Sequence, residues 1–189
     1  MTEGQEEGLS RKRLVGSHSG FAAASLLCAA VLAALPARAD TVAPVKLAVF
    51  AFELEDSSAA ATPEQAPADA ARLTEVTTEV RQLFAHSGRY SLVDTGAADA
   101  PAAKAHTLGR CNGCDAAIAL KLGAEQSFVG VVTRITRTEY VVRFEIRDAR
   151  TGGIVSAANS GLRMGADYSW GRGTVRLIKD RLLEVQDRR

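Results

Sequence analysis

The hydrophobic positions of the chain follow the two periodicities of regular secondary structure. Residues 46–54 form a nearly continuous apolar run, which predicts a strand covered on both faces. Over residues 68–87 apolar side chains recur at helical spacing, and Gly88 follows where a left-handed C-cap favours glycine. Residues 138–147 alternate between two faces, the pattern of a strand with one solvated side.

The remaining pattern completes one small domain. The Ala-, Ser- and Pro-rich stretch 55–67 is predicted to be a flexible loop. Strand–helix alternation in the first half favours parallel pairing, and the later strands favour an antiparallel meander. We therefore expect an α/β (α+β) fold with a single mixed sheet of about five strands, in the order β-α-β-α-β-β-β-α, with helices packed on it. The further elements are strands over 89–93, 127–136 and 154–162, a helix over 115–122 with Asp115 as N-cap, and a helix over 168–185.

The N-terminus has the three parts of a secretory signal peptide. Residues 11–13 are basic, residues 20–35 are uncharged and mostly apolar, and small residues precede Asp40. We predict that residues 1–39 are a signal peptide cleaved between Ala39 and Asp40, which leaves a single periplasmic or secreted domain over residues 40–189. The alternative is an uncleaved anchor, in which case this segment is the protein's only membrane contact.

Cleavage would make the charge of the chain neutral. The full chain has 23 basic and 22 acidic residues, and the signal peptide holds four of the basic and three of the acidic ones. A neutral domain lacks the basic surface that phosphate backbones require, so we expect no nucleic-acid partner.

One cysteine pair is the main candidate for chemical reactivity in the mature chain. Cys28 leaves with the signal peptide, and Cys111 and Cys114 remain in a C-x-x-C turn. A structural disulfide is favoured because an exported chain meets an oxidising compartment. Two alternatives stay open: a redox-active pair at a helix start, and a metal site formed by His106, Cys111, Cys114 and Asp115.

No other residues form a catalytic constellation. His86 lies at a helix end, where a cation suits the helix dipole, and Trp170 is expected to be a core anchor. No serine lies in a G-x-S-x-G turn, and no glycine-rich loop has the context of a nucleotide site. We therefore expect a non-enzymatic protein without a cofactor that binds a protein partner. A small-ligand binder or a hydrolase, with a site assembled from distant residues, is the further alternative.

Several short motifs carry a resemblance to a known family. They are residues 47–54 (LAVFAFEL), 87–90 (SGRY), 111–115 (CNGCD), 148–152 (DARTG), 169–170 (SW) and 176–178 (RLI). With them, the chain resembles an uncharacterised family of secreted bacterial proteins, grouped as a domain of unknown function. More distantly, it is similar to the N-terminal domain of TolB and to the periplasmic α/β domains of CsgG-type and FlgO-type assembly proteins. Those are binding and assembly modules, so the resemblance implies an envelope or periplasmic partner and supplies no site residues.

Overall fold

The computed structural model describes residues 43–58, 62–96, 107–163 and 170–184. Residues Thr41–Arg189 form one compact unit. The predicted signal peptide and its cleavage site lie outside the described residues, as does His106. Among the described helices, none combines the length and the hydrophobicity that a membrane span requires.

The predicted α/β class is confirmed, with a single mixed sheet of six strands and three described helices. The sheet order is β3-β1-β4-β5-β6, and β2 also pairs with β4. The pairs among β1, β2, β3 and β4 are parallel, whereas β4–β5 and β5–β6 are antiparallel. The elements are β1 (Val45–Val49), β2 (Glu53–Asp56), α1 (Ala66–His86), β3 (Tyr90–Val93), α3 (Cys114–Lys121), β4 (Gln126–Arg134), β5 (Glu139–Asp148), β6 (Ile154–Arg163) and α4 (Trp170–Ile178), with short helical turns η1 (Pro63–Gln65), η2 (Leu108–Arg110) and η3 (Lys179–Leu183).

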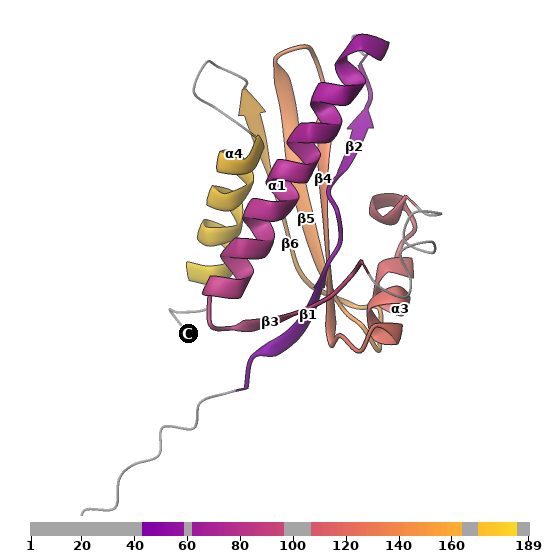
Figure 1. Cartoon of the computed structure of the whole chain (residues 1–189), viewed down its shortest axis with the longest axis vertical. Helices are drawn as coiled ribbons and strands as arrows, with labels where there is room; N and C mark the ends of the chain where they lie inside the picture. The colour runs from indigo at the N-terminus through magenta and orange to yellow at the C-terminus, as the bar shows by residue number, and fades with distance from the viewer. Residues whose placement is uncertain (1–42, 59–61, 97–106, 164–169, 185–189) are drawn as a thin grey trace, which may run out of the picture. The chain divides into compact units, whose positions relative to one another are not determined.

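The sheet lies between α1 and α4 on one side and α3 on the other (Figure 1). It separates two hydrophobic clusters. Helices α1 and α4 cover one face, where Phe128 and Phe144 stack at the centre of the larger cluster. Helix α3 and η2 cover part of the other face, against Val129 and Val131 of β4. The predicted alternation of β5 is confirmed, since its side chains are buried and partly exposed in turn. Trp170 is buried against Tyr140, as expected of a core anchor.

The first predicted strand is two strands, which corrects the expected number. The chain leaves the sheet after Val49 and returns at Glu53, so β1 and β2 lie in line along the same edge of β4. Side chains of α1 satisfy the backbone groups at this break. Arg81 donates to the Val49 carbonyl at 2.8 and 3.2 Å, and the Phe52 N–H donates to Thr77 Oγ1 at 3.0 Å. The apolar run hid the break because both pieces are buried or half-buried.

The break also requires a glycine in the neighbouring strand. The Phe52 ring packs directly over Gly130 of β4, where a Cβ atom would lie 2.2 Å from the ring carbons. Any side chain at position 130 would therefore displace Phe52 from the core.

Two local predictions need correction. The predicted loop 55–67 is shorter at both ends, because β2 runs to Asp56, η1 begins at Pro63 and α1 begins at Ala66; its flexibility stays a prediction. Its prolines lie in the first turns of helical segments, where the missing N–H costs nothing.

Asp115 is not the N-cap of α3. Gly113 precedes the helix in a left-handed conformation, and Asp115 is a buried residue of the first turn.

Replacing Thr77 with valine tests the role of α1 at the break. Thr77→Val keeps the side-chain volume and leaves the buried Phe52 N–H without its acceptor, so we expect a loss of about 1–3 kcal/mol in the free energy of unfolding. Thr78→Val is the matched control, because exposed Thr78 bonds only to the Thr74 carbonyl of its own helix. Urea denaturation measures both variants, and equal losses would contradict this role.

Candidate functional site

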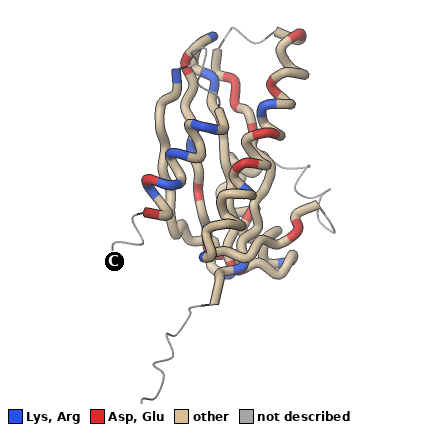
Figure 2. Tube along the Cα trace, turned by 60° about the vertical axis from the view of Figure 1, so that its left-hand side comes forward, with Lys and Arg blue, Asp and Glu red and all other residues tan. Residues whose placement is uncertain are grey.

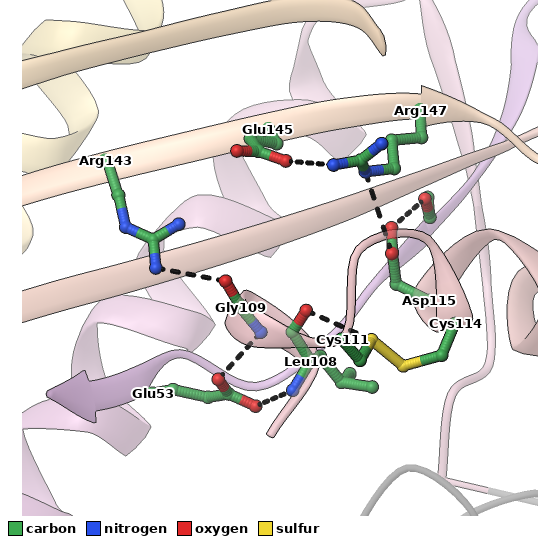
Figure 3. The surroundings of a disulfide bond; sticks show 10 residues. Glu53, Leu108, Gly109, Cys111, Cys114, Asp115, Arg143, Glu145 and Arg147 are labelled. Atoms are coloured by element: carbon green, nitrogen blue, oxygen red, sulfur yellow. Dashed lines mark hydrogen bonds and ion pairs between the residues drawn. A yellow bond between two sulfur atoms is a disulfide. The ribbon is translucent and has the colours of Figure 1, made fainter. Parts of the chain in front are cut away.

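The cysteine pair lies in a turn between η2 and α3 (Figure 3). The sulfur atoms of Cys111 and Cys114 are at disulfide-bonding distance, and their Cα atoms are 5.6 Å apart. Asn112 and Gly113 both have positive φ, which closes the turn tightly. Both cysteines are half-buried against the smaller hydrophobic cluster. That the pair is oxidised in the exported protein stays a prediction.

A carboxylate of β2 holds η2 against the sheet. Glu53 accepts the backbone N–H of Leu108 at 2.6 Å and of Gly109 at 2.9 Å. Charge-assisted bonds of this kind are stronger than neutral ones. Gly109 approaches so closely that a Cβ atom would lie 2.5 Å from a methyl carbon of Val131. From β5, Arg143 donates to the Gly109 carbonyl at 3.1 Å.

Asp115 anchors the other side of the turn. Ser127 of β4 donates to its Oδ2 at 2.5 Å, and Arg147 Nε lies 3.8 Å from its Oδ1. Arg147 also bonds to Glu145 at 2.8 Å. Figure 3 shows Asp115 turned toward Arg147, with the sulfur atoms on the Leu108 side. These contacts engage the carboxylate, and the described residues hold no cluster of three or more His, Cys, Asp or Glu side chains that could bind a metal.

Glu55 connects the same network to solvent. Its Oε1 accepts from Arg143 at 2.8 Å and from Arg110 at 3.1 Å. Burial by itself raises the pKa of Glu55, but the hydrogen bonds and charges of Arg110 and Arg143 outweigh it and hold the pKa below the ordinary value of 4.5.

Sequence reasoning missed Glu53 and Glu55. The available signal was two glutamates on alternate positions at the end of a hydrophobic strand.

A second network of ion pairs joins the C-terminal ends of β2 and β4 to α1. Arg134 is buried and bonds to Asp56 at 2.5 Å and to Asp69 of α1. Its guanidinium carbon lies 5.7 Å from the centroid of the Tyr140 ring. Burial lowers the pKa of Arg134, but Asp69, Tyr140 and Asp56 together raise it above its ordinary value. These contacts link β2, β4 and α1.

His86 lies at the end of α1, as predicted, and its Nδ1 is 2.7 Å from the Gln82 carbonyl oxygen. It borders a groove of about 800 Å³ between α1 and α4. Glu75 and Glu79 line the α1 side of this groove, opposite basic residues of α4. Burial raises the pKa of Glu79, and the negative charge of Glu75 raises it further.

Strand β6 is an open edge of the sheet. Within the described residues it pairs only with β5, and residues 156–163 do so without interruption. Ile154 and Val155 are 56% and 50% exposed. The strand contains no proline and no charge before Arg163. Natural edge strands are commonly protected by proline and by charged side chains, and residues 154–162 of this edge have neither.

These features define a small mixed α/β domain with an ion-paired turn on one face and an open antiparallel edge. The chain belongs to the DUF3280 family, described as a protein of unknown function (DUF2380), whose sequence profile matches residues 45–182. This agrees with the predicted resemblance to a family of unknown function.

Comparison with solved structures gives distant likenesses. The C-terminal domain of LpoB from Salmonella enterica has 17% identity and a TM-score of 0.48, with 66% of this chain and 87% of that chain covered. Lipoprotein GNA1162 from Neisseria meningitidis has 13% identity and a TM-score of 0.42, with 76% and 98% covered. TolB from Acinetobacter baumannii has 15% identity and a TM-score of 0.39, with 72% and 27% covered. No curated protein matches the sequence significantly, and a likeness to CsgG-type and FlgO-type proteins stays a prediction.

Glu53→Gln tests the attachment of η2. The amide weakens the two bonds to the backbone of η2, so local opening becomes more frequent and trypsin cleaves after Arg110 roughly tenfold faster. Glu125→Gln is the matched control, because Glu125 accepts the Lys46 N–H elsewhere on the sheet. Mass spectrometry of the digests measures the rates. Equal cleavage of both variants would show that Glu53 does not hold the turn.

The lowered pKa of Glu55 predicts a pH dependence. A carboxyl whose pKa is lower in the folded than in the unfolded chain stabilises the fold fully above its unfolded value, and the stabilisation is lost as the pH falls through the folded value. Arg143→Met removes one cause of the lowering. Its free energy of unfolding should therefore fall less steeply than that of the parent from about pH 5 to about pH 3. Exposed Arg137→Met should keep the parental slope; a parental slope for Arg143→Met would exclude this coupling.

Proposed function

We propose that this protein is a non-enzymatic binding module that receives an extended segment of an envelope protein at the open edge of β6. The outer edge of residues 156–163, which has no strand partner in the described part of the chain, is the observation that carries the proposal. Every second N–H and C=O along an edge strand faces outward and needs a partner. An added strand supplies these hydrogen bonds, as in other cases of recognition by strand addition.

The surface chemistry supports binding in preference to catalysis. The carboxylates beside the cysteine turn are engaged in holding the fold: Glu53 binds the η2 backbone, and Asp115 binds Ser127. A general base needs a lone pair directed at a substrate, and here those lone pairs are directed at the protein itself.

The envelope location is part of the proposal. It is supported by the signal-peptide pattern over residues 1–39 and by the bonding distance of the two sulfur atoms. We also propose that the pair is a structural disulfide in the oxidising compartment. A metal role is less well supported, because Asp115 is committed to Ser127 and Arg147.

Peptide selection followed by hydrogen exchange tests the edge. A library of random twelve-residue peptides is selected on the oxidised domain, and the exchange of backbone amides is measured with and without the enriched peptides. Alternate amides of residues 156–163 should exchange fast in the free domain and become protected in the complex. The short opposite edge, β3, is the internal control and should not change.

Two results would overturn the proposal. One is protection of all β6 amides in the free monomer, since the edge would then already be covered. The other is a selection that yields no peptide able to protect β6.

A further inference from the structure

A groove of about 290 Å³ runs beside the open edge. On the sheet side it is lined by Asn159 and Ser160, which are consecutive residues of β6. Side chains of consecutive strand residues point to opposite faces, so a groove that reaches both must touch the edge of the strand. Its other wall is α4 and η3, through Gly173, Arg176, Leu177, Asp180 and Arg181.

The charges in this groove do not balance. Arg176 is paired with Asp180 at 3.6 Å, one helical turn away. Arg181 is exposed and has no ion-pair partner among the described residues. Strand β6 contributes no acidic residue. Among the residues that the structure describes, the groove therefore presents one guanidinium without an ion-pair partner beside the outer edge of β6.

The other side of α4 is compensated. Arg172 and Lys179 line the groove toward α1, where Glu75 and Glu79 lie on the opposite wall, and the pair Arg176–Asp180 borders both grooves. Figure 2 shows the basic positions of this helix spaced along its length. Arg181 lines the groove beside β6 and not the groove toward α1, so its positive charge lies on the side of β6.

We infer that the segment received by β6 is acidic, with Asp or Glu side chains at alternate positions that face α4. This inference rests on the proposed function, because it specifies the partner of the same edge. The alternation follows from strand geometry: only every second side chain of an added strand faces the helix side of the sheet. Complementary charge then selects the partner and fixes its register.

A second copy of the chain is the competing occupant. Pairing of β6 with β6 of another copy would place two α4 helices side by side, each with an exposed Arg181. Opposed like charges are unfavourable, so the charge pattern favours a different, acidic chain.

Charge reversal at the groove tests the inference. The most enriched peptide of the selection above is compared with a copy in which Asn and Gln replace its Asp and Glu residues. Binding is measured by fluorescence anisotropy in about 0.05 M and about 1 M NaCl. The acidic peptide should bind the parent more tightly in low salt, and high salt should reduce the difference. Arg181→Glu should weaken this peptide about three- to tenfold in low salt.

Lys121→Glu is the matched control. It makes the same change of charge on exposed Lys121, the last residue of α3, on the opposite face of the sheet, and should leave binding within about twofold. Both substitutions are on exposed helical surfaces, so thermal melting should confirm that both variants fold.

The outcomes distinguish an acidic partner from the binding edge itself. Peptides that protect β6 but lack acidic enrichment would overturn the acidic partner and leave the binding edge intact. The absence of any peptide that protects β6 would overturn both. Concentration-dependent protection of β6 without peptide, together with a dimer in analytical ultracentrifugation, would assign the edge to a second copy.

Discussion

The fold depends on how α1 satisfies the backbone where β1 gives way to β2. The Val49 carbonyl accepts from Arg81 and from Thr95, and the Phe52 N–H donates to Thr77. A buried backbone group without a partner costs about 1–3 kcal/mol, at least as much as one ordinary hydrogen bond contributes net. With both groups satisfied, the chain can shift its path and continue along β4.

That continuation places Glu53 and Glu55 on the face opposite α1. From there Glu53 holds η2, and Glu55 meets Arg143 and Arg110. The cysteine turn is therefore positioned by β2 and β5 as well as by its own sulfur atoms. The polar residues of this face act as a frame for the turn, which explains why their oxygen and nitrogen atoms are directed inward.

Hydrophobic periodicity predicted those parts of the fold in which each side chain is plainly either buried or exposed. The alternation of β5, the stripe of α1 and the burial of Trp170 all follow from it. The break after Val49 was not predictable, because its apolar residues are compatible with one strand or with two, and the deciding partners are 25 to 32 residues away. Asp115 was misassigned because capping chemistry is local, whereas its actual partners, Ser127 and Arg147, come from distant strands. The open edge could be predicted only as the last strand of a meander.

The central position of β4 has a consequence for the timing of folding. Both β1 and β2 pair with β4, whose first residue follows Leu47 by 79 positions, and β3 reaches the sheet only through β1. Parallel pairing over such a sequence distance is slow to nucleate, because a long loop must close before any ladder forms. The N-terminal two thirds of the chain thus cannot complete a stable core while it is being synthesised. We expect a polypeptide built in this order to complete its core only after the last strands have left the ribosome.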